Sequence, residues 1–176
     1  LHRFDTFDDG ALEFLVPRGH RGRRAHGRVR SGPPVIGLDL VRAPQQIEMA
    51  ARKAPSDLVL SLGVVDGRNV WRANLPDILD RIEPFVARYG IDRMQIATSC
   101  SLLHVPIDVQ LESALDPDLK SWLAFANQKM SEISTLGTAL VSGRAAVQAT
   151  LAASSAAAKA RGCSPKVHDA AVAARA

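Results

Sequence analysis

Three polar residues at the end of an apolar run are the first candidates for chemistry in this sequence. The run spans residues 58–65 and is followed by Asp66, Arg68 and Asn69. A carboxylate, a guanidinium and an amide at one strand end could contact an anionic or polar ligand. Asp66 and the glycine after it also mark a tight turn, so these side chains could instead hydrogen-bond neighbouring loops. The residue types alone leave both interpretations open.

Cys100 and His104 form a second candidate set, after another apolar run at 94–99. A thiol and an imidazole are the groups of nucleophile–base pairs and of zinc sites. The pair supplies at most two ligands, whereas protein zinc sites use three or four. The sequence contains no Cys-x-x-Cys, no His-Glu-x-x-His and no glycine-rich phosphate loop. We therefore expect no catalytic residue and no metal site in this chain.

The elements that position these residues begin with three short apolar runs, at 35–40, 58–65 and 94–99. Each run has the length of a β-strand and is nearly continuous rather than alternating, which is typical of strands covered on both faces. In parallel sheets, functional groups gather at the carboxyl ends of the strands. Both candidate sets follow such an end.

Helical patterns fill the segments between these runs. One helix is predicted over residues 45–53. A second is predicted over 75–89, with Asn74 as a candidate N-cap and Gly90 placed to end it with a positive φ. Pro84 lies inside the second pattern and predicts a kink, because proline has no amide hydrogen to donate to the preceding turn.

A longer helix is predicted to begin at Asp116 and Pro117, which form a cap followed by a proline. Its apolar face would comprise Leu119, Trp122, Leu123, Ala126, Met130 and Ile133. Farther on, residues 145–176 hold 14 alanines in 32 positions. Alanine favours helix, so we expect one or two helices there that need a docking surface to be stable.

Strands that alternate with amphipathic helices indicate βαβ units and a parallel sheet. A complete (β/α)₈ barrel takes about 250 residues, and this chain has 176. With three strands visible, we expect a partial sheet or a partial barrel. The predicted organisation is a basic segment at 1–34, a βα region at 35–142 and an alanine-rich helical tail at 143–176.

The net charge of +4 arises at the two ends of the chain. Residues 1–34 carry 7 basic and 4 acidic groups, and the run 17–34 contains no acid. This run could be an Arg/Gly arm on nucleic-acid phosphates, a solvated linker, or the product of a damaged reading frame. Its composition cannot bury a face, so we expect disorder. We favour the linker or the damaged frame, and expect no nucleic-acid partner.

No stretch approaches the about 20 uninterrupted apolar residues of a membrane span, so no membrane association is expected. The two cysteines, Cys100 and Cys163, cannot make a disulfide scaffold, which favours a reducing, cytoplasmic setting. The chain does not begin with Met, and we expect it to be a piece of a longer protein.

Two loop sequences resemble those of the cobalamin-independent methionine synthases. They are residues 59–72 (VLSLGVVDGRNVWR) and 99–108 (SCSLLHVPID). The segment 119–129 (LKSWLAFANQK) continues the similarity, which extends over residues 35–175.

This resemblance implies part of an N-terminal TIM-type (β/α) barrel, with about three to four βα units followed by C-terminal helices. The family transfers a methyl group from methyltetrahydrofolate polyglutamate to homocysteine, giving methionine. A zinc ion in its C-terminal barrel binds the homocysteine sulfur and lowers its pKa. The chain would then be an inactive fragment of a zinc-dependent methyltransferase. Its partner would be the missing catalytic barrel, which handles folate and homocysteine.

The resemblance carries over no zinc, homocysteine or folate contact to a numbered residue here. Cys100 resembles the duplicated counterpart of a zinc cysteine, and would be a relic of that ligand position without its partners. Asp66, Arg68 and Asn69 remain the substrate-binding candidates. The alternatives are a stand-alone half-barrel that docks to a catalytic chain, and a nucleic-acid binder acting through residues 17–34.

Overall fold

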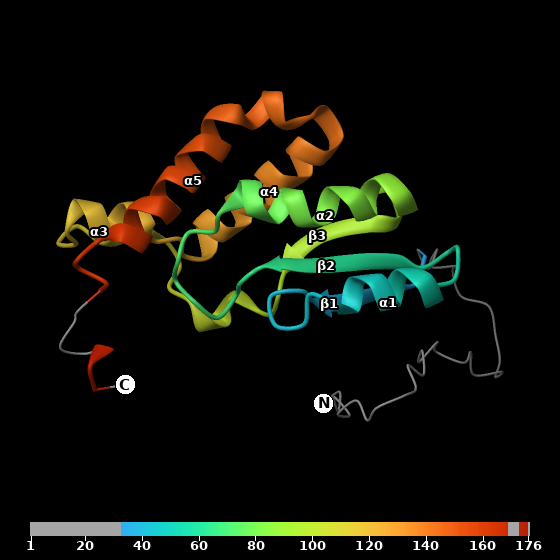
Figure 1. Cartoon of the computed structure of the whole chain (residues 1–176), viewed down its shortest axis with the longest axis horizontal. Coiled ribbons are helices and arrows are strands. Elements are labelled where there is room, and N and C mark those ends of the chain that lie inside the picture. The colour runs from blue at the N-terminus through green and yellow to red at the C-terminus, as the bar shows by residue number, and fades with distance from the viewer. Residues whose placement is uncertain (1–32, 169–172, 176) are drawn as a thin grey trace, which may run out of the picture.

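The computed structural model describes residues 33–168 and 173–175. The basic run at 17–34 lies almost wholly outside the described residues, so the expectations for residues 1–34 stay predictions. Within the described residues, strands and helices alternate up to the last predicted strand, and helices follow it (Figure 1).

Three parallel strands form one sheet in the order β1-β2-β3. They are β1 (Val35–Asp39), β2 (Val59–Val65) and β3 (Met94–Thr98). The prediction of three strands in a parallel sheet is therefore confirmed. The central strand, β2, is the most buried of the three, in keeping with its nearly continuous apolar sequence.

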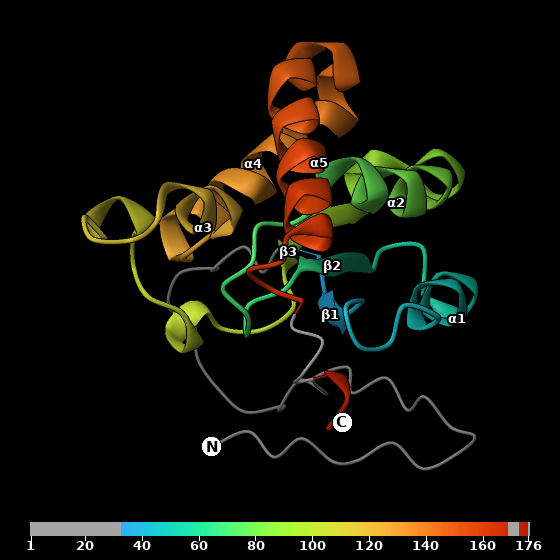
Figure 2. The same ribbon diagram turned by 60° about the vertical axis from the view of Figure 1, so that its left-hand side comes forward.

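Helices α1 (Gln46–Lys53), α2 (Leu75–Tyr89) and α4 (Ala126–Ser142) pack against this sheet. Figure 2 shows them ranged around one side of it. They share one core with alternate strand residues such as Leu38 and Leu62. The fold is thus a set of βα units with a common apolar core on the helix side.

The ends of α2 are only partly as predicted. Asn74 occupies the N-cap position, but its side chain makes no capping hydrogen bond and instead donates from Nδ2 to the carboxylate of Asp77. Gly90 ends the helix with a φ of 87°, the positive value that glycine tolerates. Pro84 lies inside the helix, which continues past it to Tyr89.

The prediction of one long helix from Pro117 to Ile133 is wrong. The chain forms the short helix α3 (Pro117–Trp122), then an extended break, then α4. The break occurs because Leu123 pairs with Trp71 in an isolated antiparallel bridge. The predicted cap is confirmed, since the Asp116 side chain accepts hydrogen bonds from the first turn of α3.

The alanine-rich segment forms helix α5 (Gln148–Cys163), as expected. It packs on α2 and α3, and its buried side chains are Leu151 and Ser154. The Ser154 hydroxyl accepts a hydrogen bond of 3.3 Å from the amide of Leu75 at the start of α2. α2 is therefore the docking surface that this weakly apolar helix needs. Of the helices described, none is long and apolar enough to cross a membrane.

Gly63 in β2 should be intolerant of any side chain. A Cβ there would lie 2.6 Å from the carbonyl oxygen of Leu38 and 2.9 Å from the Cα of Ser99, both of them backbone atoms. Gly63→Ala should lower the free energy of unfolding by about 1–3 kcal/mol, measured by urea unfolding. Gly37→Ala is the matched control, because no atom of the described residues lies within 4 Å of its added Cβ. Equal stability of the two variants would contradict this packing.

Candidate functional site

The predicted Asp66 cluster lies at the carboxyl end of β2 and largely builds its own loop. Asp66 accepts hydrogen bonds of 2.8 Å from the amide of Arg68 and from the side-chain amide of Asn69. Asn69 in turn accepts a hydrogen bond of 3.0 Å from the amide of Trp71. Two of the three predicted side chains therefore shape the turn, as the sequence allowed. The exposed Arg68 side chain has no partner among the described residues.

The second candidate loop touches the first at the edge of the sheet. The amide of Gly67 donates to the hydroxyl of Ser99 at 3.2 Å. A Cβ on Gly67 would lie 2.7 Å from the Cys100 carbonyl oxygen and 3.1 Å from its sulfur. The structure thus brings Cys100 beside the Asp66 turn.

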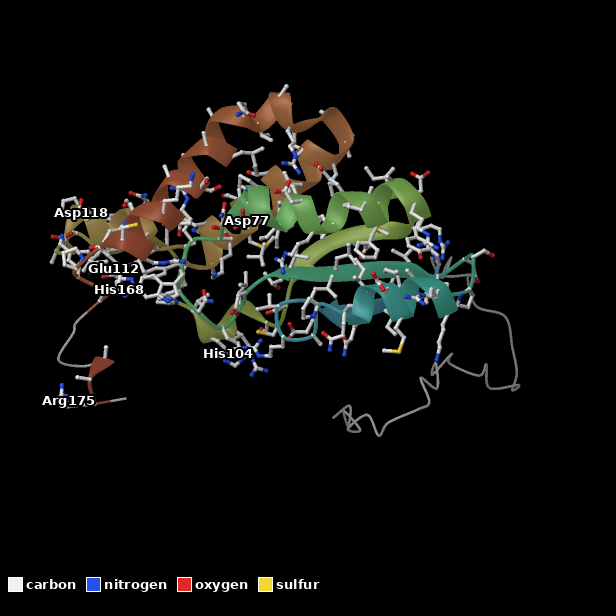
Figure 3. All side chains as sticks on the ribbon, viewed as in Figure 1. Asp77, His104, Glu112, Asp118, His168 and Arg175 are labelled. Carbon is white, nitrogen blue, oxygen red and sulfur yellow. The ribbon has the colours of Figure 1, made fainter. Side chains whose placement is uncertain are left out.

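His104 does not join this group. It ends a short 3-10 turn (Leu102–His104) and is exposed, and Figure 3 shows it well apart from Asp77 at the start of α2. The Cys100 thiol lies 3.7 Å from the carbonyl oxygen of Ser101. Among the residues described, no group of three or more His, Cys, Asp or Glu side chains could hold a metal ion.

The loop after the Asp66 turn is held by backbone pairing to the break between α3 and α4. The amide of Arg72 donates to the carbonyl of Trp122, and the amide of Ala124 donates to the carbonyl of Val70, both at 2.8 Å. Arg161 of α5 adds a contact of 3.4 Å to the Arg72 carbonyl. Two segments that lie far from it in the sequence, the α3–α4 break and α5, therefore hold this loop.

Two buried charged residues on α4 lie beneath the same loop, and sequence reasoning missed both. Lys129 is 1% exposed, and its ammonium donates to the carbonyl of Trp71 at 3.3 Å. Glu132 is 6% exposed, and its Oε1 accepts from the amide of Ala73 at 2.9 Å. The second carboxylate oxygen of Glu132 is buried and has no hydrogen-bond partner among the residues that the structure describes.

Burial shifts the pKa values of both groups toward their neutral forms. Desolvation lowers the pKa of Lys129, against the opposing attraction of Glu132, Asp66 and Cys100. Desolvation also raises the pKa of Glu132, against its hydrogen bond from Ala73 and the attraction of Lys129. The two charges therefore offset each other only in part.

The helical spacing of these residues is present in the sequence, but the incorrectly predicted start of the helix obscured it. Lys129, Glu132, Leu136 and Ala139 make one buried face of α4. The predicted face passed through Met130, which is 55% exposed. The extended break at Leu123 restarts the helix and shifts its buried face by one position.

A polar cleft of about 480 Å³ opens where the loop, α2, α4 and α5 meet. We call it the strand-end cleft. The charged side chains that line it are Arg72, Arg81, Arg161, Lys129, Asp66 and Asp77. The cleft thus contains the predicted Asp66 and Asn69, together with basic residues that the sequence did not single out.

A sequential parallel sheet with helices on one side and polar groups at its strand ends defines a protein built of repeated βα units. Residues 28–89 match the family model described as the N-terminal domain of cobalamin-independent synthase.

Close relatives cover most of the chain. A protein of Nitrobacter winogradskyi named 5-methyltetrahydropteroyltriglutamate–homocysteine methyltransferase is 67% identical over 141 residues, which is 79% of this chain and 18% of that protein. Equally named proteins of Rhodopseudomonas palustris and Caulobacter vibrioides are 64% and 59% identical, each over 81% of this chain and 18% of their own length.

Most of the chain is thus similar to a segment of the cobalamin-independent synthases, and residues 28–89 match the N-terminal domain of that family. It spans about a fifth of the length of these relatives, 18% in each case. The resemblance seen in the loop sequences is confirmed.

The raised pKa of Glu132 predicts how stability depends on pH. Because the folded protein holds this proton more tightly than the unfolded chain, the group stabilises the fold below its unfolded pKa of 4.5. That contribution is lost as the pH rises through the folded pKa. Glu132→Gln removes this titration and should gain stability relative to the wild type as the pH rises from about 4 to about 8, by on the order of 1 kcal/mol.

Urea unfolding followed by tryptophan fluorescence at several pH values would measure this gain. The exposed Glu112→Gln is the control for loss of one negative charge. A stability difference between Glu132→Gln and the wild type that stays constant over this pH range would show that the carboxyl group titrates normally.

Proposed function

We propose that this chain forms part of the N-terminal barrel of a cobalamin-independent methionine synthase, and that it contributes structure rather than catalytic groups. The enzyme would transfer a methyl group from methyltetrahydrofolate polyglutamate to homocysteine. The observation that carries the proposal is the 67% identity to a relative that bears the name of this methyltransferase.

The arrangement of the sheet supports a barrel. A barrel of βα units needs parallel strands in sequential order with their helices outside, as β1, β2 and β3 have them. Each outer strand pairs on one side only within the described residues. Unpaired strand edges are a liability that barrel closure removes, so further strands of the enzyme would pair along β1 and β3.

Zinc belongs to the family reaction as a metal that activates the homocysteine sulfur. The residues of this chain do not fit a zinc site. Cys100 lies against the Asp66 turn while His104 is exposed on a separate turn, and the described residues offer no third ligand to them. We therefore assign zinc, folate and homocysteine to the remainder of the enzyme, and the reaction to its catalytic barrel. Both cysteines are free, which suits the cytoplasm.

A second candidate function is that of a half-barrel module that docks to a separate catalytic chain. Exposed aliphatic side chains on the segment after β3 favour it, because Leu103 is 92%, Ile107 70% and Leu111 74% exposed. Large apolar side chains gathered in one exposed segment mark an interaction surface. The nucleic-acid alternative rests on residues 17–34, which lie almost wholly outside the described residues.

A chimera tests the proposed function directly. Residues 35–168 would replace the aligned segment of the Nitrobacter winogradskyi relative in a bacterial strain that lacks methionine synthase. We expect growth without added methionine, because a segment of the same barrel should restore the fold and leave the catalytic barrel intact. A strain that carries the same chimera with Gly63→Ala should grow more slowly or yield less soluble chimeric protein.

A chimera that is soluble but does not support growth without methionine would contradict the proposed function. Co-expression of the 176-residue chain with the relative lacking that segment separates the two candidates. Growth in that arrangement would favour the docking module.

The chain itself should neither retain zinc nor turn over substrate. The chain would be incubated with zinc and then dialysed to remove unbound metal. Metal analysis should find far less than one zinc per chain, since a zinc site uses three or four ligands. An assay with methyltetrahydrofolate triglutamate and homocysteine should give no methionine above a blank. Stoichiometric zinc that is lost in Cys100→Ser would overturn the assignment of Cys100.

A further inference from the structure

The strand-end cleft has an excess of positive charge. Its lining includes four basic side chains, those of Arg72, Arg81, Arg161 and Lys129, against the two acids Asp66 and Asp77. The middle of the sequence, by contrast, is mildly acidic. The excess is therefore local to this cleft.

The two acids of the cleft are already engaged by neutral groups. Asp66 accepts from the amide of Arg68 and the side chain of Asn69. Asp77 accepts from the side chain of Asn74. The ion pairs recorded for the described residues include neither acid. Asp66 attracts the Lys129 ammonium, whereas Arg72, Arg81 and Arg161 form none of the ion pairs recorded for the described residues.

Other arginines of the protein behave differently. Arg144 pairs with Asp80 and Glu83 of α2 at 2.6–2.7 Å, and Arg52 pairs with Glu48 at 2.9 Å. Paired arginines of this kind hold elements together. The cleft arginines have no carboxylate at ion-pair distance among the described residues, although the charge of Arg72 acts on Glu132, so ion pairing does not account for their place there.

One of these arginines is held in a fixed position. The guanidinium of Arg161 lies 5.1 Å from the centroid of the Trp71 ring, in a cation–π contact. It also approaches the Arg72 carbonyl at 3.4 Å through one nitrogen, and its remaining N–H groups have no recorded hydrogen bond within the described part of the chain. A guanidinium stacked on an aromatic ring is pre-organised for a planar anionic group.

We propose that the strand-end cleft binds a small anion, the carboxylate or phosphate group of a small molecule, through Arg72, Arg81 and Arg161. Its volume of about 480 Å³ suits a small ligand. It also lies at the carboxyl ends of parallel strands, where such folds bind ligands. This site is independent of the proposed methyl transfer, which takes place elsewhere in the enzyme.

The experiment is a titration of the ¹⁵N-labelled 176-residue chain at constant ionic strength, with inorganic phosphate in one series and glutarate in another. The indole N–H of Trp71 and the Nε–H of Arg161 report on the cleft by NMR. We expect saturable shifts confined to the cleft, with dissociation constants on the order of millimolar. The series that binds more tightly identifies the anionic group.

Arg81→Gln is the test variant, because Arg81 is exposed and forms none of the ion pairs recorded within the described part of the chain. It should weaken binding at least about threefold, through loss of one charge at the site. Arg88→Gln is the matched control, since it removes the same charge two turns along α2 and outside the cleft. It should leave binding unchanged.

Two results would overturn the proposal. One is the absence of saturable shifts with both anions. The other is equal weakening by Arg81→Gln and Arg88→Gln, which would reflect net charge alone. An unchanged urea midpoint for Arg81→Gln confirms that the variant is folded. Because binding is measured on the chain itself, its failure would leave the proposed methyltransferase function untouched.

Discussion

The pairing of Trp71 with Leu123 is the contact on which the strand-end region depends. Two hydrogen bonds of 2.8 Å flank it, from Arg72 to Trp122 and from Ala124 to Val70. It joins segments about 50 residues apart, so loop-closure entropy opposes it. The core beneath α2 and α4 offsets that cost. Once formed, the pairing ends α3, begins α4 and places the cleft wall.

The buried charges of α4 follow from this pairing. A loop drawn against the protein brings its own amides and carbonyls out of water, and each of these needs a partner. Lys129 supplies a donor to the Trp71 carbonyl, and Glu132 supplies an acceptor to the Ala73 amide. Burying both charges is costly. Their two hydrogen bonds fix the position of the loop, and the loop in turn places Trp71 against Arg161.

Sequence reasoning succeeded where the decisive information is local. Apolar runs predicted the three strands, and cap and periodicity signals predicted α2 and the start of α3. It failed at Leu123, because the bridge that breaks the helix there comes from Trp71, far away in the sequence. That one long-range contact moved the buried face of α4, and so Lys129 and Glu132 escaped notice.

The same distinction holds for the candidate site. The prediction of polar residues at strand ends required only the strand pattern, and Asp66 and Asn69 do line the cleft. The arginines come from α2, α5 and the end of the loop. No spacing rule links residues 72, 81 and 161, because their meeting depends on how α5 docks on α2.

The two faces of the sheet explain how such a segment can serve a larger barrel. Leu38, Leu62 and Ile96 lie side by side in register and contribute to the core on the helix side. The next row, toward the opposite face, is Gly37, Ser61 and Gln95. This row offers little apolar surface to bury, so hydrophobic collapse along it contributes little to assembly. Assembly with the rest of a barrel would then depend on backbone hydrogen bonds along β1 and β3. Such hydrogen bonds determine which strands pair and in which register, whereas apolar contact alone would only hold the segments together.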